Sequence, residues 1–173
     1  MTVGESSPPA SKTLDVDQLP VHLDDLFRAA YALCGSRHDA EDLVQETYAR
    51  VLARPRQLRP GTELGYLMRA LRNTWIDTMR SRAARPITTN GLDDVEFMAT
   101  RNADPEAALQ ARAAYAAIAK LSVPLREAIV AVDILGLSHK QAARSLKARE
   151  GTIMSRVFRA RQKVARELEG TIS

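Results

Sequence analysis

The sequence predicts an all-α protein of two small helical domains joined by a flexible linker, with a helix-turn-helix in the second domain. Three observations support this fold class. Apolar residues recur every three or four positions along most of the chain, which is the helical period. No segment shows the strict apolar–polar alternation of a half-buried strand. Finally, residues 86–106 carry prolines, an Asn-Gly pair and acids without periodicity, over a length unusual for a loop inside one domain.

The first elements are a tail and two helices. Residues 1–20 are rich in serine and proline and have little to bury, so we expect a disordered tail. The first domain, residues 21–85, opens with an amphipathic helix that ends at Gly35. The second helix begins at Ser36 or Asp39, because either side chain can cap its free N–H groups.

This second helix is acidic near its start. Its carboxylates are Asp39, Glu41, Asp42 and Glu46, and its one nearby arginine, Arg50, lies toward the other end. The helix dipole favours this polarity, so the pattern is also compatible with a purely structural role.

A third helix is predicted from about Glu63 to Ala84. This helix and the loop before it are strongly cationic, and Tyr66 and Trp75 lie among the charges. Arginines beside aromatic rings suit the binding of unpaired nucleic acid. Trp75 also falls on the apolar stripe and is expected to pack in the core, which leaves Tyr66 as the better candidate for stacking. The arginines of this stretch are Arg54, Arg56, Arg59, Arg69, Arg72, Arg80, Arg82 and Arg85.

The second domain, residues 107–173, ends in two helices joined by a short turn. Ser138 is expected to cap the first of them, and the turn falls at Lys147–Arg149. The last helix has a buried stripe that includes Ile153 and Val157, and its other faces carry many arginines. This arrangement suits insertion into a major groove, although a basic amphipathic helix also suits a solvated face, a membrane or a partner helix. Lys147 stands where glycine is common, because that turn often needs a positive φ.

Composition excludes several classes. The net charge of +4 fits a polyanionic partner. The single cysteine, Cys34, permits no intrachain disulfide and is expected to be a small buried residue, and we predict no metal site, cofactor or catalytic residue. No apolar stretch is long enough to cross a bilayer, and the first residues resemble no signal sequence. We therefore expect a cytoplasmic protein without membrane insertion.

Three segments resemble a known family. The run Asp39-Ala-Glu-Asp-Leu-Val-Gln-Glu-Thr-Tyr48 resembles the polymerase-binding helix in region two of bacterial sigma factors. The run Tyr66-Leu-Met-Arg-Ala-Leu-Arg-Asn73 resembles the promoter-opening helix of the same region. The segments Gly136–Ala143 and Gly151–Arg161 resemble region four. Two such regions separated by a linker are the layout of the extracytoplasmic-function (ECF) group.

The resemblance implies an alternative sigma factor that binds core RNA polymerase and directs promoter-specific initiation. Its implied partners are the clamp helices of the largest polymerase subunit, the polymerase flap, promoter DNA and an anti-sigma factor. The implied polymerase-binding residues are Asp39, Glu41, Asp42, Gln45 and Glu46. The implied minus-ten residues are Arg54, Arg56, Arg59, Tyr66, Arg69, Arg72, Asn73 and Arg80. The implied minus-thirty-five residues are Arg149, Thr152, Ser155, Arg156 and Arg159.

Two other classes of protein would explain part of this sequence. A one-component regulator that binds duplex DNA without polymerase would explain the helix-turn-helix, but it leaves the acidic and arginine-rich helices as a coincidence. A helical metal enzyme could use His38, Glu41 and Asp42, but a di-metal site needs further Glu and His pairs on facing helices, and His22 and His139 do not supply them.

Overall fold

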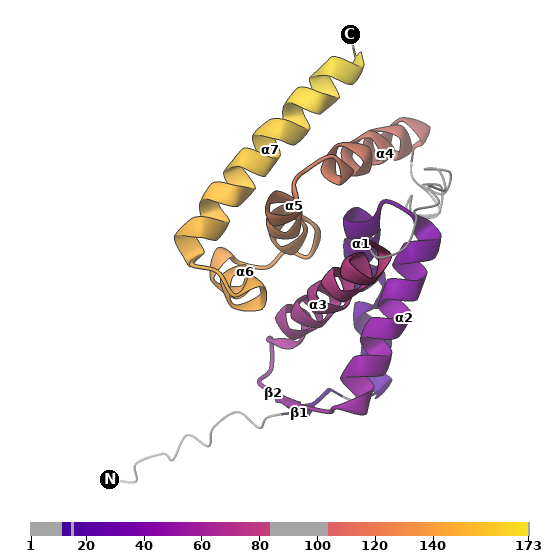
Figure 1. Ribbon diagram of the computed structural model, residues 1–173, viewed down its shortest axis with the longest axis vertical. Helices are drawn as coiled ribbons and strands as arrows, with labels where there is room; N and C mark the ends of the chain where they lie inside the picture. The colour runs from indigo at the N-terminus through magenta and orange to yellow at the C-terminus, as the bar shows by residue number, and fades with distance from the viewer. Residues whose placement is uncertain (1–11, 15, 84–103, 173) are drawn as a thin grey trace.

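The computed structural model describes residues 12–14, 16–83 and 104–172. Within them every element of secondary structure is helical except for one short strand pair (Figure 1). The predicted all-α class is therefore confirmed. The first eleven residues of the expected tail and most of the expected linker lie outside the described residues.

Three helices form the N-terminal half: α1 (Leu23–Cys34), α2 (Arg37–Ala53) and α3 (Glu63–Ala83). Gly35 ends α1 because it adopts the left-handed conformation, with a φ of 72°, and its N–H donates to the carbonyl of Tyr31 at 2.8 Å. Ser36 then caps α2, since its hydroxyl accepts from the backbone N–H of Asp39. Both boundaries were predicted.

The C-terminal half contains α4 (Pro105–Ala119), α5 (Val123–Ile129), the π-helical turn η3 (Val130–Ile134), α6 (His139–Leu146) and α7 (Glu150–Ile172). Ser138 and Gln141 form a reciprocal capping box at the start of α6. Lys147, with φ 51° and ψ 46°, is the one described residue other than glycine with a positive φ. The turn between α6 and α7 thus keeps the left-handed geometry although it carries a lysine.

The described part of the expected disordered tail is ordered, which corrects that prediction. Strand β1 (Lys12–Thr13) pairs antiparallel with β2 (Gln57–Leu58), and a 3₁₀ helix, η1 (Val16–His22), leads into α1. Leu14 and Leu19 are buried in the core, and the Tyr48 hydroxyl donates to the carbonyl of Leu19 at 3.0 Å. Burial of Leu14 and Leu19 accounts for the order of this segment, although its overall composition is polar.

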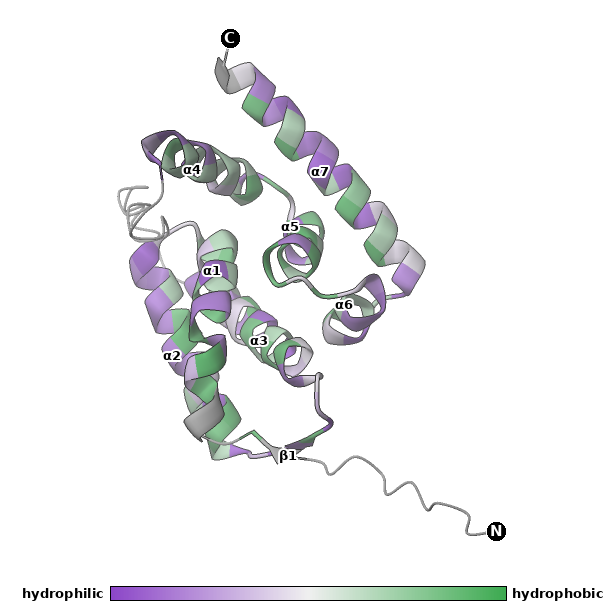
Figure 2. Cartoon of the chain, turned by 180° about the vertical axis from the view of Figure 1, so that it is seen from behind, coloured by the Kyte–Doolittle hydropathy of each residue, from purple (hydrophilic) through white to green (hydrophobic). Residues whose placement is uncertain are grey.

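The two halves pack against each other (Figures 1 and 2). Helix α1 contacts α4, α5 and η3, and α3 contacts α6, so one apolar core continues across both halves. Within this contact, the ring of Tyr31 in α1 meets the ring of Tyr115 in α4 edge to face, with the ring centroids 5.3 Å apart. This close packing was not predicted from the sequence. Within the described part of the chain, no helix combines the length and apolarity needed to cross a membrane.

Candidate functional site

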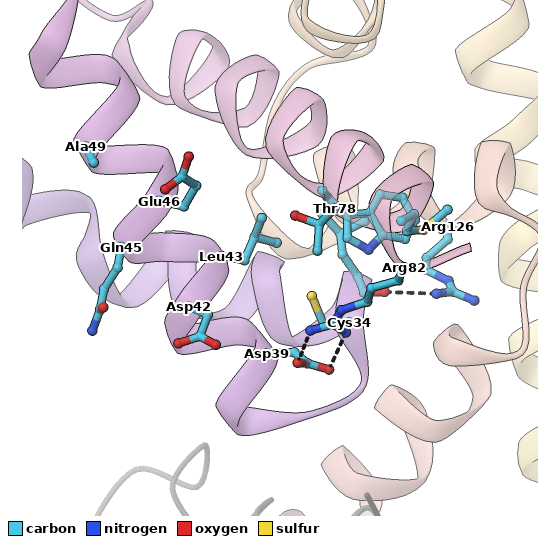
Figure 3. A pocket seen from close by; sticks show the side chains of 13 residues that line it. Cys34, Asp39, Asp42, Leu43, Gln45, Glu46, Ala49, Thr78, Arg82 and Arg126 are labelled. Carbon is cyan, nitrogen blue, oxygen red and sulfur yellow. Dashed lines mark hydrogen bonds and ion pairs between the residues drawn. The ribbon is translucent and has the colours of Figure 1, made fainter. Parts of the chain in front are cut away.

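A cavity of about 670 Å³ opens between α2, the end of α3 and the start of α5 (Figure 3). We call it the acidic cavity, because α2 supplies carboxylates to its rim. Its lining residues are Leu33, Cys34, Asp39, Asp42, Leu43, Gln45, Glu46, Ala49, Trp75, Thr78, Met79, Arg82 and Arg126. Four of the five residues predicted to bind polymerase are thus brought together here.

These four side chains differ in their exposure and in the partners that hold them. Asp39 is held by the Arg82 guanidinium of α3, with both oxygens paired at 2.9 and 2.5 Å. These hydrogen bonds lower the pKa of Asp39 below its ordinary value. Asp42, Gln45 and Glu46 are exposed, with Asp42 3.4 Å from His38. Glu41, the fifth predicted residue, is absent from the cavity lining and pairs with Arg37 at 2.9 Å.

The floor of the acidic cavity is structural. Trp75 is 3% exposed, as expected for a core residue, and the Arg126 guanidinium lies 5.7 Å from its ring centroid. Arg126 also donates to the carbonyls of Leu33, Ala119 and Leu121. Burial raises the pKa of the Cys34 thiol to about 12, so this cysteine is protonated at neutral pH, in keeping with its predicted packing role.

A second cavity, of about 460 Å³, lies over the other end of α3, and we call it the basic groove. It is lined by Arg50, Val51, Arg54, Arg56, Tyr66, Arg69, Ala70, Asn73, Thr74, Asp77 and Lys147. Five cations thus surround Tyr66 and Asn73, with Asp77 as the one acid in the lining. Such a surface suits a phosphate backbone with an adjacent base.

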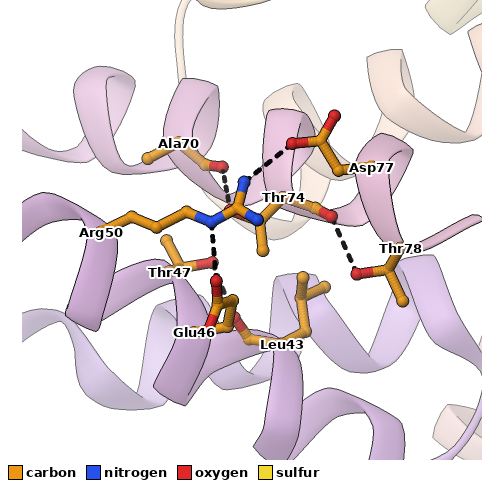
Figure 4. Close-up of polar contacts among 8 residues, drawn as sticks. All are labelled: Leu43, Glu46, Thr47, Arg50, Ala70, Thr74, Asp77 and Thr78. Carbon is orange, nitrogen blue, oxygen red and sulfur yellow. Dashed lines mark hydrogen bonds and ion pairs between the residues drawn. The ribbon is translucent and has the colours of Figure 1, made fainter. Parts of the chain in front are cut away.

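Arg50 connects the two cavities (Figure 4). Its Nε donates to Glu46 and its Nη1 to Asp77, both at 2.8 Å, and these contacts raise the pKa of Arg50. Hydrogen bonds from Thr47 and Thr74 to carbonyls one turn earlier lie beneath it. Arg50 therefore lines the basic groove and at the same time pairs with one carboxylate of the acidic cavity, Glu46.

The predicted minus-ten set is only partly brought together. Arg54, Arg56, Tyr66, Arg69 and Asn73 share the basic groove. Arg59, Arg72 and Arg80 are absent from its lining, and Arg72 turns instead toward Glu127 of α5. Sequence reasoning missed Arg50 and Lys147. The lysine could have been noticed as an unusual turn residue, but nothing in the sequence links it to α3.

Helix α7 exposes a mixed face. Of the five predicted readers, Arg149 and Arg159 are exposed, and the others, Thr152, Ser155 and Arg156, are partly exposed. Met154 and Phe158 are 52% and 64% exposed, one turn apart, and were not predicted. Large apolar side chains on a basic helix are suited to contact thymine methyl groups. Arg161 is held by Asp133 of η3 through two hydrogen bonds of 2.9 and 2.6 Å.

Comparison with known families accounts for both halves. Sigma-70 region 2 matches residues 21–85, and Sigma-70, region 4 matches residues 111–164. We use "region two" and "region four" for these ranges below.

Curated relatives extend the match. The ECF RNA polymerase sigma factor SigE of Mycolicibacterium smegmatis is 36% identical over 83% of this chain, which spans 57% of that protein's length. EcfG of Rhodopseudomonas palustris is 35% identical, with 79% of this chain and 75% of that protein covered. SigM of Mycobacterium tuberculosis is 34% identical, with 85% and 73% covered. The chain belongs to the ECF family of RNA polymerase sigma factors.

Solved structures agree. The sigma factor RpoE of Bartonella quintana, in complex with the anti-sigma factor NepR, has a TM-score of 0.72 at 27% identity and covers 88% of this chain and 95% of its own. CnrH, in complex with the cytosolic domain of CnrY, has a TM-score of 0.60 at 25% identity and covers 89% and 86%.

Proposed function

We propose that this chain binds core RNA polymerase through the rim of the acidic cavity and directs it to promoters through the basic groove and α7. The observation that carries the proposal is the basic groove, where Tyr66 and Asn73 share one cavity with five cations. The function needs no catalytic step from the chain itself, since binding energy alone would recruit the polymerase and hold the opened DNA.

For polymerase, the proposed contacts are Asp42, Gln45 and Glu46, which are exposed side by side on one helix. An acidic rim fits a basic surface on the clamp helices of the largest subunit. Asp39 and Glu41 are proposed as weaker contributors, because Asp39 is only partly exposed with both oxygens held by Arg82, and Glu41 lies outside the cavity lining. Glu46 has an arginine partner too, Arg50, but it stays exposed on the rim. Region four is proposed to meet the polymerase flap.

For the minus-ten element, the proposal places an unpaired base beside Tyr66 and Asn73. Arg54 and Arg56 precede α3 and are exposed at the groove, where they would hold the phosphates of the non-template strand. Flipping a base out of the stack costs a few kcal/mol, so both the base contact and the phosphate contacts are needed.

For the minus-thirty-five element, α7 is proposed to enter the major groove. Arg156 is the preferred base reader, since arginine can donate two hydrogen bonds to one guanine. Arg149 and Arg159 are exposed and would hold phosphates, and Thr152 and Ser155 supply hydroxyls. Met154 and Phe158 add an apolar contact to this surface.

An anti-sigma factor is a further proposed partner. The solved structure of RpoE named above is a complex of a sigma factor with such a protein, and it covers 88% of this chain. The similarity supports the same class of partner here and leaves its identity open.

Run-off transcription with core polymerase on a genomic library tests the proposed function. We expect discrete transcripts that depend on both the chain and core polymerase, and their upstream sequences should share two elements. Binding of the chain alone to promoter duplex, with no gain in transcription when core is added, would instead favour a one-component regulator.

A further inference from the structure

We infer that the segment before α1 is a positioning element of the minus-ten site. We call this segment the strap, and it consists of β1, Leu14 and η1. The strap holds the loop of residues 54–62, which joins α2 to α3. The inference rests on the proposed role of this loop in minus-ten binding, to which it contributes three arginines: Arg54, Arg56 and Arg59.

The loop has hydrogen bonds of its own near its two ends. The Arg54 N–H donates to the carbonyl of Val51 at 3.3 Å. At the other end, the N–H and the hydroxyl of Thr62 donate to the carbonyl of Arg59 at 3.1 and 2.7 Å. Two prolines interrupt the segment between these ends, and each removes an N–H that could have fixed the backbone.

The strap holds the middle of the loop. Strand β1 pairs antiparallel with β2, which places Thr13 opposite Gln57 (Figure 1). One position further along, the N–H of Leu14 donates to the carbonyl of Arg56 at 3.4 Å. Arg56 lines the basic groove, so the strap fixes the backbone of a residue that is proposed to hold a DNA phosphate.

The strap is itself anchored in the core. A strand pair of this length is too short to be stable alone, so its order must come from other contacts. Leu14 is 5% and Leu19 is 7% exposed, and the Tyr48 hydroxyl of α2 donates to the carbonyl of Leu19. Leu14 therefore links core and loop within one residue, because its side chain is buried while its N–H bonds to Arg56.

Holding the loop in the free chain should strengthen DNA binding. A loop with many conformations loses that freedom when it binds, and this entropy cost subtracts from the affinity. With the strap in place, the cost is met when the chain folds. The phosphate contacts in the complex stay the same in number, so release of the strap should weaken binding without changing its salt dependence.

The first test removes the anchor in the full chain. Leu14→Ser should release the strap, and Leu109→Ser, at a leucine of α4 that is 67% exposed, is the matched control. The readout is binding, with core polymerase, to a fluorescent oligonucleotide carrying the non-template minus-ten sequence of a promoter recovered in the run-off assay. Leu14→Ser should bind about fivefold or more weakly than the unaltered chain, and the control should bind equally well.

Salt dependence separates positioning from direct contact. The slope of log affinity against log salt should be the same for Leu14→Ser and the unaltered chain. Arg56→Ala should instead lower that slope by about 0.7, because it removes one phosphate contact to a single strand. Circular dichroism and a pull-down of core polymerase check that Leu14→Ser is folded.

A reversible cross-link tests whether position alone restores binding. Opposite residues of an antiparallel pair have Cα atoms about 4.5–5.5 Å apart, which a disulfide can span. We would add Thr13→Cys and Gln57→Cys to Leu14→Ser in a Cys34→Ala background, with each single cysteine variant as a control. Oxidation of the double cysteine variant should restore minus-ten binding to about the level of the unaltered chain, and reduction should remove the gain.

A milder variant leaves the buried leucines in place, in case Leu14→Ser does not fold. Lys12→Pro removes an N–H of β1, whereas Lys12→Ala keeps it, so the first should bind the minus-ten strand about twofold or more weakly than the second. Equal binding by the two would overturn the inference.

The other outcomes are equally decisive. Unchanged binding by folded Leu14→Ser, no recovery on oxidation, or cysteines that fail to oxidise would overturn the positioning role and leave the proposed function intact. With Leu14 retained, weaker binding by the oxidised than by the reduced cross-linked chain would also overturn it, because the strap would then have to leave the loop. Failure of the unaltered chain with core to bind the minus-ten strand would overturn the proposed function itself.

Discussion

Helices α2 and α3 line both the acidic cavity and the basic groove. Each cavity also holds one cation from region four and one aromatic ring of α3, but the two pairs play opposite parts. In the acidic cavity, Arg126 is anchored by three carbonyls beside buried Trp75. In the basic groove, exposed Lys147 lies near partly exposed Tyr66. The first pair is part of the core, whereas the second pair is accessible to a ligand.

This difference shows how one small fold separates stability from recognition. The acidic cavity has buried Trp75 and the anchored Arg126 beneath a rim of exposed acids on α2. The basic groove instead has most of its cations exposed at the rim. Each cavity includes one cation from region four, Arg126 in the first and Lys147 in the second, but only Lys147 is exposed to a ligand.

The largest expected effect is a difference in the free energy of unfolding between variants of Trp75 and Tyr66. Trp75→Ala should lower the free energy of unfolding by about 3–5 kcal/mol, because it empties a buried site. Tyr66→Ala should cost much less stability and should reduce promoter opening, measured by permanganate reactivity of unpaired thymines. Denaturation followed by circular dichroism gives the first quantity. Equal destabilisation by both variants would contradict the assignment of Tyr66 to the groove.

The second prediction reverses charge on each surface in turn. Asp42→Lys with Glu46→Lys should weaken core polymerase binding tenfold or more and leave the fold intact, since both side chains are exposed and the exposed pair of Glu46 with Arg50 contributes about 1 kcal/mol or less. Arg54→Glu with Arg56→Glu should retain core binding and lose minus-ten binding. Each double variant is the control for the other in a pull-down and an oligonucleotide binding assay. Loss of both activities in either variant would mean that the two surfaces are not independent.

Most of the rim of the acidic cavity was predictable from the sequence, and much of the basic groove was not. The acids of α2 lie on one continuous helix, and helical spacing alone places Asp42 and Glu46 together. The cap at Ser36 and the left-handed turn at Gly35 were equally local. The basic groove depends on a contact between residues some 75 positions apart, so no local pattern could place Lys147 beside Tyr66 or turn Arg72 toward Glu127. Burial of Leu14 and Leu19 was missed for the same reason.

The third prediction concerns readout by α7. Arg156→Ala should relax preference at one or two positions of the upstream element, with a loss of about 1–3 kcal/mol in discrimination. Arg159→Ala should weaken all upstream sequences alike and reduce the salt dependence by a slope of about 0.9. Phe158→Ala should lower affinity mainly for sites with thymine. Selection from a promoter library measures all three, and a uniform loss in Arg156→Ala would reassign that arginine to the phosphate backbone.

The smallest expected effect concerns Asp39, the one acid of the acidic cavity that is held by α3. Asp39→Asn should leave core binding closer to that of the unaltered chain than Asp42→Asn does, because Arg82 already occupies the carboxylate. It should lower the free energy of unfolding at pH 7 by about 1 kcal/mol or less, since the pair is partly solvated.

The pH dependence of that difference has a definite sign. The hydrogen bonds from Arg82 lower the pKa of Asp39 in the folded chain, so the stabilisation is fully present above the unfolded pKa, near 3.8, and is lost as the pH falls through the lower folded value. Urea denaturation should therefore show a constant difference between the two proteins from pH 7 to pH 5, and convergence at the most acidic pH values where the fold survives. Asp24→Asn, at an exposed residue of α1, serves as the control. A difference that grew on acidification would show that Arg82 does not stabilise the ionised carboxylate.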